Sequence, residues 1–66
     1  MYKEAGDLYV KGKMFTSAAR CYLKAKLYEE AGKCFETAKK YTDAIIAYKD
    51  GGGTENYKKV IRLIQR

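Results

Sequence analysis

Apolar residues recur along the chain in a repeating unit of thirteen. Residues 15–25 and 28–38 each read aromatic, alanine three residues on, cysteine and aromatic at six and seven, and alanine at ten. The same template finds one more copy before these stretches and one after them, so four copies tile residues 1–52 without a gap. An internal repeat decides a fold more firmly than local propensity does, so the rest of the chain is interpreted through it.

The position of each residue within its unit predicts helices. Counted from Met1, the apolar positions of a unit are the first, second, fifth, eighth, ninth and twelfth. At about 100° per residue they fall within an arc of roughly 120°, the stripe of an amphipathic helix. One continuous helix is excluded, because one unit makes about 3.6 turns and each stripe would be rotated away from the last. We therefore predict separate helices of about three turns, joined by two or three residues and antiparallel to their neighbours.

The ends of the units carry the residues typical of helix termini. Acidic residues lie in the first turns and lysines in or just past the last turns, where each complements the helix dipole. Thr16, Ser17 and Thr42 are candidates for positions near the N-cap. Gly12 and Gly51–Gly53 can adopt the left-handed backbone that ends a helix. These features agree with the unit boundaries.

Alanines in the middle of the stripe alternate with large aromatic residues. The small side chains allow a ring of the next helix to approach the backbone, and each tyrosine hydroxyl needs a partner or a route to water. We expect the rings to lie between helices with their oxygens near the edge. Cys21 and Cys34 occupy the same unit position, and we expect structural thiols rather than a disulfide or a reactive site. The aromatic residues expected in the core are Tyr2, Tyr9, Phe15, Tyr22, Tyr28, Phe35, Tyr41 and Tyr48.

The glycine run interrupts the tiling and divides the chain. Residues 1–52 form four helical repeat units, and residues 53–66 form a glycine-led C-terminal capping helix with Thr54 as its N-cap. Its stripe contains Tyr57, Val60, Ile61 and Ile64. Met1 occupies the position held by Met14 and Leu27, which suggests a fragment of a longer solenoid. The predicted fold is all-α, an antiparallel array of about five short helices with thirteen residues in each helix unit.

The charge balance raises the question of an anionic partner. The chain has 14 Lys and Arg against 8 Asp and Glu, a net charge of +6. An antiparallel array sends the lysines of alternate units to opposite edges, which divides this charge. The last helix concentrates it again, at Lys58, Lys59, Arg62 and Arg66. Binding of nucleic acid or another anionic partner is therefore the alternative function, and the last helix is its expected place.

Residue types limit the chemistry. The chain contains no histidine, so neither cysteine has the usual base partner, and two cysteines one unit apart make an incomplete zinc set. We predict no catalytic, cofactor-binding or metal-binding residues, and no enzyme activity. No apolar run approaches the roughly 20 residues that span a bilayer, so we expect no membrane insertion. The expected location is intracellular, cytoplasmic or nuclear.

The spacing of Phe15, Ala18, Tyr22 and Ala25, repeated in the next unit, resembles the second helix of a tetratricopeptide repeat (TPR). The TPR has 34 residues and a closing proline, whereas two units here make a shorter repeat of twenty-six without proline. The resemblance is therefore to the wider class of short-helix TPR-like α-solenoids, and it implies that the predicted array is a TPR-like α-solenoid fragment. Long proteins that combine TPR-like and ankyrin repeats carry similar Ala-Cys-aromatic runs. This resemblance implies protein binding, usually of a peptide or helix on a curved surface.

The predicted function is a non-catalytic protein–protein interaction or scaffold segment. Its partners are a protein or peptide and the neighbouring repeats of the parent chain. Val10, Leu23 and Ile46 fall outside the arc that packs the array. They either contact a helix two units away or contribute to an exposed ligand groove, to which Leu23 and Val10 would belong. Together with Lys58, Lys59 and Arg62, Val10 and Leu23 are the candidate partner-binding residues.

Overall fold

The computed structural model describes residues 1–65 apart from the side chain of Thr54, and Arg66 lies outside the described residues. Three residues separate each helix from the next, so the chain breaks at every unit boundary, including the one between Ala25 and Tyr28. The prediction of short all-α repeat units is confirmed. The described residues form five α-helices: α1 (Tyr2–Lys11), α2 (Phe15–Lys24), α3 (Tyr28–Thr37), α4 (Tyr41–Asp50) and α5 (Thr54–Ile64).

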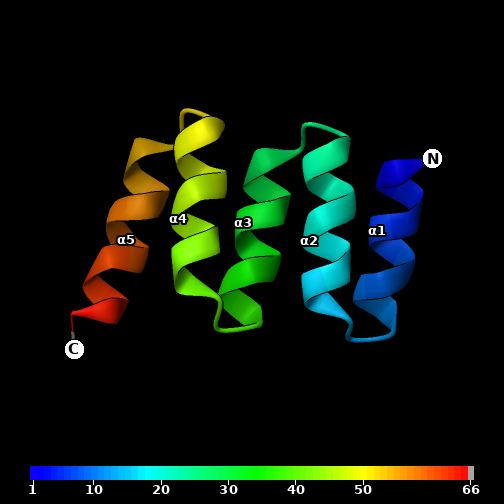
Figure 1. Ribbon diagram of the computed structural model, residues 1–66, viewed down its shortest axis with the longest axis horizontal. Helices are drawn as coiled ribbons and strands as arrows, with labels where there is room; N and C mark the ends of the chain where they lie inside the picture. Colours follow the sequence, from blue (N-terminus) through cyan, green and yellow to red (C-terminus); the bar gives the residue numbers. More distant parts are fainter. Residues whose placement is uncertain (66) are drawn as a thin grey trace.

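The helices lie side by side in the order of the sequence, and each runs antiparallel to the one before it (Figure 1). The main packing contacts join consecutive helices along the whole row. The Cα atoms span 34 × 22 × 12 Å, which makes a flat, elongated body. Each helix is therefore stabilised mainly by its neighbours in the sequence, two for an inner helix and one for α1 or α5, as in a solenoid.

The turns that join the helices share one hydrogen-bonding pattern. In the first turn, the Lys13 N–H donates to the Val10 carbonyl over 2.9 Å and the Met14 N–H donates to the Tyr9 carbonyl over 2.8 Å. These two bonds define a Schellman motif, which satisfies carbonyls that the end of a helix leaves free. The same pair of bonds recurs at the end of each of the next three units. Each connection is thus a copy of the same turn.

The left-handed residue of these turns is a lysine in three cases out of four. The φ angle is 61° at Lys13, Lys26 and Lys39, and 78° at Gly52. The prediction for Gly12 is wrong: its φ is −84°, because it is the C-cap residue and the reversal comes one residue later. Gly51 likewise keeps a negative φ of −84° as a C-cap, and Gly53, with φ −82°, is an N-cap. Of the predicted glycines, Gly52 alone has the left-handed backbone.

The helix starts also differ from the prediction. Met14, Leu27 and Lys40 are the N-cap residues of α2, α3 and α4, and none makes a side-chain cap hydrogen bond. Thr16, Ser17 and Thr42 lie near these N-caps, as predicted, at the second or third position of their helices. The prediction of Thr54 as the N-cap of α5 is wrong. The reason is that the last residue of each Schellman turn is already the N-cap of the next helix. The hydroxyl-bearing residues therefore lie one to three residues past the N-cap, and Gly53 is the N-cap of α5.

Replacing the left-handed lysines with glycine is expected to stabilise the chain. An L-residue pays roughly 1–2 kcal/mol for this backbone conformation, whereas glycine adopts it freely but has a more flexible unfolded state. We expect a net gain of roughly 0.5–1 kcal/mol for Lys39→Gly, and a comparable loss for the reverse change Gly52→Ala. Thermal unfolding followed by circular dichroism measures both. A lower melting temperature for Lys39→Gly would contradict this account of the turn.

The core runs along the row between neighbouring helices. Tyr22, Phe35 and Tyr48 are buried, as predicted, and are surrounded by small residues. Tyr2 and Tyr9 are exposed instead, because α1 has a neighbour on one side only. The buried hydrophobic residues are Ala18, Ala19, Tyr22, Ala31, Cys34, Phe35, Ala44, Ala47, Tyr48 and Val60.

The apolar stripe predicted for α5 is confirmed in part. Val60 is fully buried, and Tyr57 is partly buried and packs against the core. Ile64, at the end of the helix, is exposed. Ile61 is partly buried, so the stripe is covered from Tyr57 to Ile61 and exposed at Ile64.

Candidate functional site

The basic residues predicted on the last helix lie together. Lys58, Lys59 and Arg62 are exposed on α5, and with Glu55 they line a surface groove of about 290 Å³. Their spacing explains the arrangement, since residues three and four apart lie on the same side of a helix. The groove thus carries three positive side chains and one carboxylate. It can attract an anionic group, and it holds no nucleophile and base pair for chemistry.

The two apolar candidates lie apart. Val10 is near the C-terminal end of α1 and Leu23 near the C-terminal end of α2. Because these helices are antiparallel and each is about 15 Å long, the two residues lie toward opposite ends of the array (Figure 1). Both are partly buried and pack against the core cluster. Ile46, the third residue outside the predicted arc, is exposed on α4.

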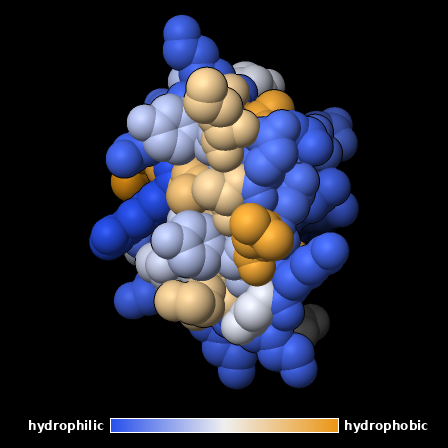
Figure 2. Space-filling model, turned by 90° about the vertical axis from the view of Figure 1, so that its right-hand side faces the viewer, coloured by the Kyte–Doolittle hydropathy of each residue, from blue (hydrophilic) through white to orange (hydrophobic). Residues whose placement is uncertain are grey.

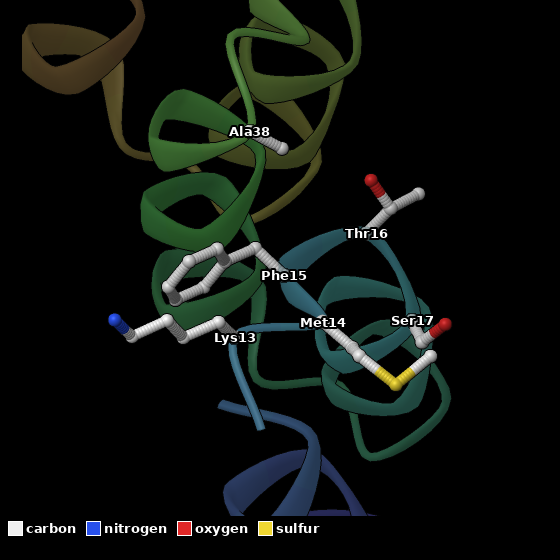
Figure 3. Close-up of a pocket in the computed structure, with 6 residues that line it drawn as sticks. All are labelled: Lys13, Met14, Phe15, Thr16, Ser17 and Ala38. Carbon is white, nitrogen blue, oxygen red and sulfur yellow. The ribbon is translucent and has the colours of Figure 1, made fainter. Parts of the chain in front are cut away.

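A shallow hollow of about 320 Å³ lies where α2 begins, beside the end of α3. Figure 3 shows that the Lys13 and Phe15 side chains extend to one side of the hollow and that Met14 lies near Ser17 on the other. The six lining residues provide one ammonium group and two hydroxyls. Among these six there is no group that acts as a general base near neutral pH. The lining residues are Lys13, Met14, Phe15, Thr16, Ser17 and Ala38.

Two buried tyrosines donate their hydroxyl protons to carboxylates. The Tyr22 hydroxyl donates to Asp7 on the preceding helix, and the Tyr48 hydroxyl donates to Glu36 on the preceding helix over 2.8 Å. The bond to Asp7 raises the pKa of Tyr22 to about 12 and lowers the pKa of Asp7. Burial, and then the bond to Glu36, raises the pKa of Tyr48. The predicted hydroxyl partners at the edge of the core are confirmed for these two rings.

The pair of Tyr22 and Asp7 predicts a dependence of stability on pH at both extremes. The pKa of Tyr22 in the folded chain lies above the unfolded value of about 10, so its contribution is full below pH 10 and is lost as the pH rises toward 12. The pKa of Asp7 is lowered, so its contribution is present above the unfolded value of about 3.9 and is lost as the pH falls below it. We expect the melting temperature of Tyr22→Phe to vary less with pH in both windows.

Two matched variants test the origin of this dependence. Asp7→Asn is expected to remove the acid step that belongs to this pair, and Tyr48→Phe is expected to flatten the alkaline step further when combined with Tyr22→Phe. Melting temperatures measured across the pH range check both results. An alkaline profile of Tyr22→Phe identical to that of the natural chain would show that this hydrogen bond does not couple to folding.

Both cysteines are free thiols, as predicted. Burial raises the pKa of the Cys34 thiol, which keeps it protonated at neutral pH. The thiolate is the nucleophilic form, so this environment opposes reactivity. Within residues 1–65 no group of three or more Cys, Asp or Glu side chains is placed to hold a metal ion.

The predicted apolar arc did not include unit position 6, counting Met1 as position 1, yet the residues at this position make close contacts between helices. Gly6 and Gly32 are buried at this position, and a Cβ atom on either would overlap the ring of Tyr22 or Tyr48 on the following helix. Position 6 lies outside the predicted stripe, yet each of the first three units has a glycine or alanine there. The small residues that recur at position 6 of successive units were the sequence signal for this contact between helices. The two Gly–Tyr contacts are two units apart and thus relate α1–α2 to α3–α4.

No helix in the described part of the chain is long and apolar enough to cross a bilayer. Comparison of the chain with protein-family models, with curated proteins and with solved structures finds no match.

Proposed function

We propose that this chain is a non-catalytic protein-interaction or scaffold segment of a TPR-like helical-repeat array inside the cell, in the cytoplasm or nucleus. The observation that carries the proposal is the flat row of helices. Its broad faces measure 34 × 22 Å, about 750 Å² in projection. A typical specific interface uses about 800 Å² on each partner. A single face of this small chain thus matches the area that one protein partner needs.

The pairing of helices supports the TPR-like assignment. Gly6 lies under Tyr22 and Gly32 lies under Tyr48, so that a helix pair repeats every two units. In TPR-like solenoids each such pair is one structural repeat, and stacked repeats form the binding surface. The assignment predicts that partners bind across several helices and make few contacts with any single one.

The distribution of positive charge favours a protein partner over nucleic acid. Lys13 and Lys39 lie in turns at one end of the helices, and Lys26 lies in the turn between α2 and α3 at the opposite end (Figure 1). Because surface charges more than about 8–10 Å apart are largely screened at physiological salt, the two ends attract an anion separately. A continuous path for a phosphate backbone is therefore absent from these turns.

The test uses the two apolar candidates. The natural chain and the double variant Val10→Ser with Leu23→Ser are each immobilised and used to capture proteins, and captured partners are then titrated in solution. We expect the double variant to lose at least tenfold in affinity while circular dichroism shows that it stays folded. Ile46→Ser, a matched change at an exposed site, serves as the control. Unfolding of the double variant, or unchanged affinity, would assign both residues to the core alone.

A second function is favoured by the groove of α5. Lys58, Lys59 and Arg62 can bind an anionic partner such as nucleic acid, and each phosphate neutralised adds about 0.7–0.9 to the slope of log affinity against log salt. Changing all three to Glu is expected to remove a slope of about 2–3 if this function holds. Affinity for single-stranded RNA that is weak and insensitive to salt in the natural chain would exclude it.

A further inference from the structure

The outer side of α1 carries several exposed apolar side chains. Leu8 is 68% exposed and Tyr9 is 38% exposed, and Met1 lies exposed at the start of the same helix. Figure 2 views the molecule from this edge and shows hydrophobic side chains along its middle, interspersed with paler ones, between hydrophilic margins. We call the surface formed by Met1, Ala5, Leu8 and Tyr9 the α1 edge.

At unit positions 5, 8 and 9 the equivalent residues are buried or partly buried wherever another helix precedes. Position 1 differs, since Met14 is 54% exposed although α1 precedes it. At position 8, Cys34, Ala47 and Val60 are buried, whereas Leu8 is largely exposed. At position 9, Tyr22, Phe35 and Tyr48 are buried, whereas Tyr9 is exposed. At position 5, Ala18, Ala31 and Ala44 are buried, whereas Ala5 is partly buried. The α1 edge is therefore the side that, in the other helices, contacts the helix before it.

The contacts inside the array show what this side needs. Tyr22 and Tyr48 each lie over a glycine of the preceding helix and donate a hydroxyl proton to a carboxylate of that helix. Phe35 has no hydroxyl. On the helix before it, α2, position 6 is the fully buried Ala19 in place of a glycine. Tyr9 has the same aromatic ring and hydroxyl as Tyr22 and Tyr48. Its partner must therefore offer a glycine or alanine under the ring and an acceptor near the oxygen.

The opposite edge of a second copy does not meet this requirement. On α5 the residue at position 6 is Lys58, which is exposed and belongs to the basic groove. A lysine there would meet the Tyr9 ring with a long charged side chain in place of a small residue. Head-to-tail stacking of copies through α1 and α5 is thus disfavoured by both size and charge.

We propose that the α1 edge binds an amphipathic helix antiparallel to α1, with Gly or Ala under the Tyr9 ring and an Asp or Glu side chain that accepts the Tyr9 hydroxyl proton. The occupant repeats the interface that already joins α1 to α2. This surface is separate from Val10 and Leu23 and from the basic groove. The proposal extends the proposed scaffold function, and its test measures helix docking rather than partner capture, so that either can fail alone.

The test extends the full chain at its N-terminus with a copy of residues 14–26. In this copy the residue that corresponds to Arg20 is changed to Asp, which supplies the carboxylate, while the copy of Ala19 is kept. The copied unit ends in lysine followed by Met1, so that the turn of residues 12–14 can form again. A second extension is identical except for Ala19→Lys in the copy. A separate peptide of one unit is avoided because isolated helices of this length are marginal in water.

The first extension is expected to raise the melting temperature by roughly 5–10 °C and to slow amide hydrogen exchange in α1 by about tenfold or more. The Ala19→Lys extension is expected to leave exchange in α1 within about twofold of the natural chain. Equal effects of both extensions, or no effect of either, would overturn the proposal. Sedimentation of the natural chain is the second measurement: a dimer that Leu8→Glu dissociates would identify a second copy as the occupant and would also overturn it.

Discussion

Replacing Gly32 with alanine is expected to destabilise the chain clearly, because the new Cβ would lie 2.4–2.6 Å from three ring atoms of Tyr48. That ring is 3% exposed, and Glu36 holds its hydroxyl, so it has little freedom to move. Overpacking of this kind costs about 1–3 kcal/mol, which outweighs the gain of up to about 1 kcal/mol from alanine in a helix. Chemical denaturation monitored by circular dichroism measures the loss.

The other glycines supply matched controls. At Gly12 a Cβ meets only backbone oxygens at 3.7–3.8 Å, and φ is negative, so Gly12→Ala is expected to be neutral or slightly stabilising. At Gly6 the distances to the Tyr22 ring are 2.8–3.0 Å, so Gly6→Ala is expected to fall between the two. A stability order other than Gly12→Ala above Gly6→Ala above Gly32→Ala would contradict the proposed ring contacts.

Replacing Phe35 with alanine is expected to unfold most of the chain. Phe35 lies on α3, the middle helix, and is 5% exposed within the core cluster. Truncation of a buried phenylalanine costs about 3–5 kcal/mol, and a chain of this length carries a total stability of only about 3–10 kcal/mol. In the described residues the main packing contacts join consecutive helices, so little other packing compensates for this loss. The far-ultraviolet circular dichroism of Phe35→Ala at 25 °C checks the result.

A second pair of variants separates the loss of packing from a change of aromatic content. Phe35→Leu keeps most of the buried volume and is expected to cost less than about 1.5 kcal/mol. Tyr2→Ala removes an aromatic ring that is half exposed and lies under the Lys24 ammonium at 5.4 Å. Its expected cost is about 1 kcal/mol or less. If Tyr2→Ala were as damaging as Phe35→Ala, the core would not lie where the burial of the side chains places it.

The candidate binding residues illustrate what spacing can and cannot predict. Lys58, Lys59 and Arg62 belong to one helix, so their sequence spacing was enough to place them around one groove. Val10 and Leu23 have the same unit position but belong to two helices with opposite directions. They therefore lie near opposite edges of the array, at the two ends of the helices. Within a helix the sequence spacing fixes proximity, and between helices the direction of the chain decides it.

The sequence by itself determined the repeat and the helices. The repeating period of apolar positions is incompatible with one straight helix, and it alone predicted breaks that separate α1 to α4. The tertiary structure decided which residues of equivalent position are buried: Tyr9 and Tyr22 share a unit position, yet only Tyr22 has a preceding helix with a glycine to receive its ring. It also placed Lys13 rather than Gly12 in the left-handed conformation. The physical reason is that helix periodicity is a property of each residue's own neighbours in the chain, whereas burial and turn geometry depend on the helix that packs against them.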